Sequence, residues 1–120
     1  MRAELAAGRK QSHWIWFVFP QIAGLGFSVR SVHFAISSGD EARAYLDHAL
    51  LGPRLIEAAR LMLAVDGRSA LDILGAPDDQ KFYSSMTLFD DVSPNDIFAA
   101  ALAKYFNGER DAATLAKLSA

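Results

Sequence analysis

The chain has 120 residues and no cysteine. Disulfide bonds, thiolate zinc sites and cysteine nucleophiles are therefore excluded, and the absence fits a protein of the reducing cytoplasm, where we expect it. An excess of positive charge is also missing, because 12 Lys and Arg residues stand against 14 Asp and Glu residues, a net charge of −2. A negative net charge offers no general attraction for nucleic acids or anionic membranes, so we expect neither as a partner.

Long apolar runs are absent as well. The longest unbroken aromatic and aliphatic run, residues 97–103, is far shorter than the roughly 20 residues that cross a bilayer. Arg2 and Glu4 near the start interrupt any apolar core of the kind that a signal peptide has. With 52% hydrophobic and 22% charged residues, the composition is that of an ordinary globular protein. The length predicts a single domain over residues 1–120.

The chain does contain one concentrated aromatic stretch, residues 12–21, with the sequence SHWIWFVFPQ. This stretch, the aromatic segment, holds both tryptophans and two of the eight phenylalanines. Six consecutive apolar residues are compatible with a buried strand or with a short buried helix. No other part of the chain has the pattern of a partner strand. We therefore predict a buried helix around which the core is built.

The rest of the chain carries helical signals, divided by glycine, proline and capping residues. Residues 1–7 favour a helix, and further helices are predicted over 29–36 after Ser28, between Ser38 and Gly52, from Pro53 to Val65, from Ser69 to Leu74, from Pro77 to Phe89, from Ser93 to Asn107, and from Asp111 to Ser119. This pattern predicts an all-α fold, a compact single-domain bundle of about seven short helices joined by short loops.

Several of these helix starts have recognisable caps. Ser12 and Ser93 are predicted to be N-caps, because a serine hydroxyl accepts from the free N–H groups of a first turn. Ser38 stands three residues before Glu41, the spacing of a capping box. Pro53 suits the first position of the helix that it opens.

Longer strings carry a resemblance to a known family. Lys10–Gly26 contains His13-Trp14-Ile15-Trp16 and Phe19-Pro20-Gln21, and the likeness continues at Gly75-Ala76-Pro77-Asp78-Asp79 and Ser84-Ser85-Met86-Thr87-Leu88-Phe89. These strings resemble the signature of a bacterial family of small α-helical proteins of unknown function. The resemblance implies an architecture and no mechanism. Members are often labelled "calpastatin", which does not fit, because such inhibitors are largely disordered and polar whereas this chain is 52% apolar.

Relatives in this family usually carry an additional helix ahead of the position of Met1. If that helix is absent, the resemblance implies an apolar surface near the N-terminus that a partner or a second copy of the chain would cover. A protein-interaction or oligomerisation module without catalytic activity is therefore the alternative function.

The spacing of the histidines gives no support to metal chemistry. His13, His33 and His48 are far apart, with no His-x-x-x-His pair, and we predict no metal and no cofactor. Gly24 and Gly26 precede a predicted helix, where backbone N–H groups could face an anion. A dinucleotide fingerprint would need a third glycine at position 29, which is a valine.

Polar residues at the two ends of the aromatic segment form the first half of a candidate site. Lys10 and His13 precede the tryptophans and phenylalanines of the segment, and Gln21 follows them. His13 is a candidate general acid or base, and Trp16 a candidate aromatic wall for a planar ligand. The structural alternatives are a histidine that caps a helix and a tryptophan that belongs to the core.

Residues 79–87 form the second half, because polar groups gather there in apolar company. On a helix, Lys81 and Ser85 are one turn apart, and Thr87 follows. A serine–lysine nucleophilic pair is conceivable, while the structural alternative is an Asp78–Lys81 ion pair with hydroxyls bonded to local backbone. We predict that the two halves form a pocket for a small anionic or nucleotide-like ligand. The sequence leaves open whether the pocket is catalytic.

Overall fold

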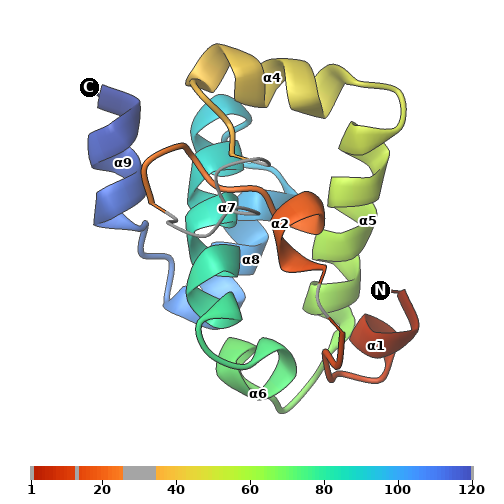
Figure 1. Cartoon of the computed structure of the whole chain (residues 1–120). Helices are drawn as coiled ribbons and strands as arrows, with labels where there is room; N and C mark the ends of the chain where they lie inside the picture. Colours follow the sequence, from red (N-terminus) through yellow and green to blue (C-terminus); the bar gives the residue numbers. More distant parts are fainter. Residues whose placement is uncertain (1, 13, 26–34, 120) are drawn as a thin grey trace.

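The computed structural model describes residues 2–12, 14–25 and 35–119, except for the side chains of residues 16 and 17. Its helices are α1 (Arg2–Ala6), α2 (Ile15–Val18), α4 (Gly39–Asp47), α5 (Leu51–Ala64), α6 (Ala70–Leu74), α7 (Asp78–Val92), α8 (Ile97–Phe106) and α9 (Ala112–Ser119). The predicted all-α fold is confirmed (Figure 1). The radius of gyration, 13.0 Å, is that of a compact domain of this length. None of the described helices combines the length and the apolarity that a membrane crossing needs.

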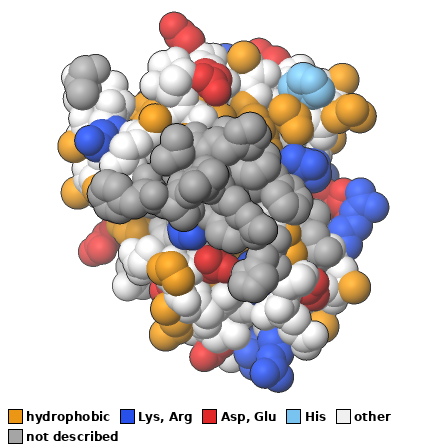
Figure 2. Space-filling view, in the orientation of Figure 1, with side chains coloured by type: hydrophobic (Ala, Val, Ile, Leu, Met, Phe, Trp, Pro, Cys, Tyr) orange, Lys and Arg blue, Asp and Glu red, His pale blue; other side chains and the backbone are white. Residues whose placement is uncertain are grey.

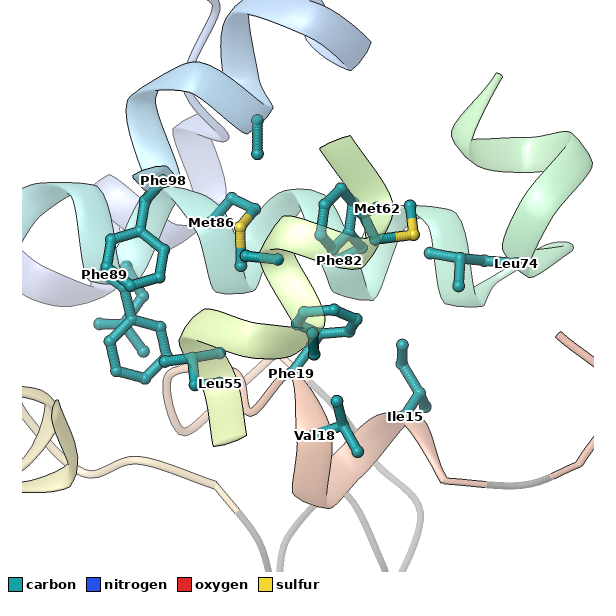
Figure 3. Close-up of a cluster of buried hydrophobic side chains, with 14 of the residues drawn as sticks. Ile15, Val18, Phe19, Leu55, Met62, Leu74, Phe82, Met86, Phe89 and Phe98 are labelled. Atoms are coloured by element: carbon teal, nitrogen blue, oxygen red, sulfur yellow. The ribbon is translucent and has the colours of Figure 1, made fainter. Parts of the chain in front are cut away.

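Helix α7 is the centre of the fold. It packs against α2, α4, α6, α8 and α9, which surround it in Figure 1. Most of its turns are buried on more than one side, and its apolar side chains point into the main core (Figure 3). The rings of Phe82 and Phe19 meet edge to face with centroids 4.8 Å apart, and those of Phe89 and Phe98 lie 5.6 Å apart. Such aromatic pairs add specific geometry to the burial of apolar area.

The apolar side chains that the structure describes in the aromatic segment are buried, as the sequence predicts, and the helical part of the segment is α2. Trp14, Ile15, Val18 and Phe19 are all in the core. The segment is pinned to α7 by Phe19, which lies one residue beyond the end of α2. A short buried helix, rather than a strand, is therefore the solution that this sequence adopts.

The prediction of a helix over 29–36 is wrong at its C-terminal end and otherwise lies outside the described residues. Ile36 forms a parallel bridge with Ile22. The Ile36 N–H donates to the Gln21 carbonyl at 2.8 Å, and the Ala23 N–H donates to the Ile36 carbonyl at 2.7 Å. This pairing fixes the chain on the C-terminal side of the aromatic segment, in the stretch that leads from α2.

The predicted caps are confirmed in part. The Ser38 hydroxyl accepts from the Glu41 N–H at 3.2 Å and caps α4. The cap of α8 is Asp96 rather than Ser93, because the Asp96 carboxylate accepts from the Ile97 N–H at 2.7 Å. Ser93 instead ends α7, and its hydroxyl donates to Asp96 at 3.2 Å. A carboxylate next to a helix start outcompetes a hydroxyl that lies one turn earlier.

Two further starts differ from the prediction. Helix α5 begins at Leu51, so Pro53 is in its first turn but not at its first position. The His48 imidazole Nδ1 accepts from the N–H groups of Leu50 and Leu51 at 3.1 and 3.2 Å and replaces the missing cap. Ser12 does not cap α2, because its hydroxyl and its N–H both donate to Glu4.

Gly52 allows α5 to begin directly against α4. A Cβ atom built at this buried position would lie 2.0 Å from the Leu46 carbonyl oxygen, which belongs to fixed backbone. At Gly39, the first residue of α4, the nearest atom to such a Cβ is a Val92 methyl group at 3.8 Å, an ordinary contact.

We predict opposite effects of the same substitution at these two glycines. Gly52→Ala should lower the free energy of unfolding by roughly 1–3 kcal/mol, because α4 and α5 must separate to admit the methyl group. Gly39→Ala should be neutral or stabilise by up to about 1 kcal/mol, because alanine restricts the unfolded chain. Urea denaturation measures the free energy of unfolding of both variants. Equal stabilisation by the two substitutions would contradict the close approach at Gly52.

Candidate functional site

The aromatic segment is held at its N-terminal side by one carboxylate. Glu4 of α1 accepts hydrogen bonds from the Gln11 N–H at 2.5 Å, the Ser12 N–H at 2.8 Å, the Ser12 hydroxyl at 2.6 Å and the Trp14 indole N–H at 3.2 Å. These donors, the Ser12 hydroxyl first, lower the pKa of Glu4 from its usual 4.5 to about 2. Donors favour the ionised form of a carboxyl group. Helix α1 therefore fixes the start of the segment through an anion.

A second anchor joins the segment to the first turn of α7. Lys10 Nζ lies 2.7 Å from Asp78 Oδ2, and Lys81 Nζ lies 3.9 Å from Asp78 Oδ1. The predicted Asp78–Lys81 ion pair is thus confirmed, with Lys10 as a second cation. The Lys10 side chain is only 7% exposed, and its Nζ stands 5.3 Å from the centroid of the Trp14 ring.

Beside this cluster lies a cavity of about 380 Å³, here called the α7–α9 pocket. One wall is the stretch after α2, which in Figure 1 passes across α7 toward α9; the others are the first turns of α7 and the start of α9. The lining residues are Gln21, Leu25, Pro77, Gln80, Lys81, Ser84, Asp111 and Ala113. The pocket thus combines a cation, a carboxylate, two amides and a hydroxyl with three apolar side chains.

The α9 wall is fixed to α7 by a small hydrogen-bond network around Asp111. Asp111 Oδ2 accepts from the Ser84 hydroxyl at 2.9 Å and from the Thr114 hydroxyl at 2.6 Å. The Asp111 N–H donates to the Thr87 hydroxyl at 3.0 Å, and that hydroxyl donates to the Tyr83 carbonyl at 3.0 Å. Asp111 therefore stands at a defined place in the pocket wall, directly before α9.

An ion pair further along α7 holds Arg110, the residue directly before Asp111. Arg110 donates through Nε and Nη2 to Asp90 Oδ2 at 2.7 and 2.6 Å, and the Asp90 side chain is 1% exposed. Tyr83 lies nearby and stacks on Phe106 with centroids 4.3 Å apart. Desolvation, then the negative charges of Asp111 and Glu109, raises the pKa of the Tyr83 phenol. The residues before α9 are therefore tied to α7 through both Asp111 and Arg110.

The comparisons with known proteins agree with this architecture. Residues 1–118 match the family described as "Protein of unknown function (DUF1810)". The chain belongs to this family. It is also 53% identical to the conserved hypothetical protein Rv1873 from Mycobacterium tuberculosis, whose crystal structure it matches with a TM-score of 0.96 over 99% of this chain and 86% of that chain. No curated protein matches the sequence. The resemblance to a helical family of unknown function is confirmed, and the pocket alone carries the chemical argument.

The seven residues predicted for the ligand site fall into different places in this DUF1810 protein. Gln21 and Lys81 line the pocket, and Lys10 is joined to Lys81 through Asp78. Ser85 and Thr87 are fully buried behind the lining residues. The predicted positions of His13 and of the Trp16 side chain lie outside the described residues.

The sequence predicts Ser85 in the pocket from its spacing to Lys81 and Thr87 as a polar member of the same stretch, but both are buried and do not line it. The Thr87 hydroxyl is used by the Asp111 network, and the Ser85 hydroxyl has no hydrogen-bond partner within the described part of the chain. Ser84, three residues after Lys81 rather than four, is the hydroxyl that faces the pocket. Its helical spacing was readable from the sequence, whereas the approach of Asp111 was not.

The described residues do not assemble a metal centre. Over residues 2–12, 14–25 and 35–119, no three or more His, Asp or Glu side chains gather closely enough to hold an ion. The charged side chains on the face shown in Figure 2 are of both signs and interspersed around its described margin.

The low pKa of Glu4 predicts a pH-dependent effect of Glu4→Gln. A folded-state pKa of about 2 against 4.5 stabilises the fold above about pH 4.5, and this contribution is lost as the pH falls toward 2. The variant should therefore melt below the wild-type protein at pH 7, and the two melting temperatures should converge near pH 2. Glu57→Gln is the matched control, because Glu57 pairs with Arg2 on the surface and should change the melting temperature little at any pH. If the melting temperatures of Glu4→Gln and the wild-type protein differ by as much at pH 2 as at pH 7, the low pKa assigned to Glu4 is contradicted.

Proposed function

We propose that this protein binds a small ligand with an anionic group in the α7–α9 pocket. The observation that carries the proposal is the meeting of Gln21 and Lys81 at one cavity, together with Gln80 and Ser84. These side chains come from two distant parts of the sequence. A few convergent polar groups in a concave and partly apolar cavity are the usual composition of a ligand site.

The size of the cavity supports a small molecule. At about 380 Å³, it falls in the range of roughly 300–1,000 Å³ that small-molecule sites occupy. Leu25, Pro77 and Ala113 supply apolar contact, while the Gln21 and Gln80 amides can donate and accept at the edge of a ligand. This combination suits a nucleotide or a sugar phosphate as well as smaller anions.

The charge next to the cavity supports an anionic group. Lys10 and Lys81 place two ammonium groups around the Asp78 carboxylate, beside the pocket wall. Lys81 is the member of the cluster that lines the pocket. Its side chain is 19% exposed, and a partly desolvated cation attracts an anion more strongly than one in bulk water. His13 stays a predicted contributor from the sequence.

Ligand binding is tested by thermal unfolding and by NMR titration with inorganic phosphate, ribose 5-phosphate and AMP. At least one probe should raise the melting temperature as its concentration exceeds the dissociation constant. Lys81→Gln should weaken that binding on the order of tenfold or more, because it removes the charge-assisted contact. Arg60→Gln is the matched control, since Arg60 is exposed on α5, which contributes no lining residue.

Two results would overturn the proposal. One is the absence of any chemical-shift change at the lining residues with every anion-bearing probe. The other is binding that Lys81→Gln and Arg60→Gln affect equally. Self-association that depends on protein concentration, without any ligand effect, would favour the alternative of an interaction module.

A further inference from the structure

Charges of opposite sign line the α7–α9 pocket. Lys81 provides a cation and Asp111 a carboxylate. The partners of Asp111 are the hydroxyls of Ser84 and Thr114 and no described cation lies within ion-pair distance of it. Neutral donors stabilise a carboxylate without cancelling its charge. A ligand with only negative groups would therefore meet attraction at one wall and repulsion at another.

Ser84 is next to both charged residues in the pocket wall. It lies three residues after Lys81 on α7, with Cβ atoms roughly 5–6 Å apart. The Ser84 hydroxyl is 2.9 Å from Asp111 Oδ2. Lys81, Ser84 and Asp111 thus line the same cavity. A small molecule with an anion at one end and a cationic donor at the other matches this arrangement.

We infer that the α7–α9 pocket takes a small zwitterion of the amino-acid type. Its carboxylate faces Lys81 and its ammonium group faces Asp111, while the amides of Gln21 and Gln80 bond the remaining polar atoms. This assignment rests on the proposed ligand-binding function and narrows it to one chemical class. The Asp111 carboxylate is the selective element, because it attracts an ammonium group and repels an anion.

The test compares amino acids with the carboxylates that lack only the amino group. Glycine is paired with acetate, β-alanine with propionate and 4-aminobutyrate with butyrate, which also varies the distance between the two charges. ¹⁵N–¹H NMR titrations in a buffer free of amines and phosphate give the dissociation constants. At least one amino acid should bind on the order of tenfold more tightly than its partner carboxylate.

Three variants separate the roles of the side chains. Asp111→Asn keeps an oxygen for Ser84 and Thr114 and should abolish the preference for the amino acid. Thr114→Val removes a neutral bond to Asp111 outside the pocket lining and keeps both charges, so the preference should survive. Lys81→Gln should weaken the binding of amino acids and of carboxylates to the same extent. Melting temperatures of each variant show that the fold is intact.

The zwitterion assignment is overturned if amino acids bind no more tightly than their partner carboxylates to the wild-type protein. It is also overturned if Thr114→Val removes the preference as fully as Asp111→Asn, because Asp111 would then act only through the local structure. Lys81-dependent binding of phosphate or AMP in separate titrations would leave the proposed function standing without the zwitterion. Failure of every probe would overturn the zwitterion assignment and the proposed function alike.

Discussion

The packing of the aromatic segment on α7 is the interaction on which the rest of the structure depends. Phe19 meets Phe82 edge to face in the core, and Trp14, Ile15 and Val18 are buried around that contact. Two polar residues at the ends of the segment are thereby placed beside the first turns of α7. Lys10 reaches Asp78 on one side, and Gln21 lines the α7–α9 pocket on the other. The apolar middle of the segment is the scaffold that holds these two residues in place.

Helix α7 serves the core and the pocket at once. Phe82, Met86 and Phe89 face the core, whereas Lys81 and Ser84 face the cavity. The start of α9 closes the pocket because Asp111 is bonded to both Ser84 and Thr87. In the proposed site, the carboxylate that fixes this wall is also the charge that a ligand would meet.

The sequence predicts features that depend on neighbouring residues and misses those that depend on tertiary contacts. The buried helix of the aromatic segment, the Ser38 cap and the Asp78–Lys81 pair follow from local spacing, and all three are present. Ser93 and Pro53 were misplaced because a stronger local competitor, Asp96 or His48, sits within a few residues. Asp111 was recognised only as a helix start, because its bond to Ser84 joins residues 27 positions apart. Ser85 has a plausible spacing from Lys81, but burial, which spacing alone does not give, decides against it.

A double-mutant cycle on Phe19 and Phe82 tests the central claim most directly. Urea unfolding of Phe19→Leu, Phe82→Leu and the double variant gives the coupling energy between the two rings. We expect a coupling of about 0.5–1.5 kcal/mol, the usual worth of an edge-to-face pair beyond its buried area. A control cycle pairs Phe19→Leu with Phe98→Leu, because the Phe98 ring packs against Phe89. The effects of these two substitutions on the free energy of unfolding should add within about 0.5 kcal/mol. Additivity of Phe19 and Phe82 would contradict the view that their contact holds the aromatic segment on α7.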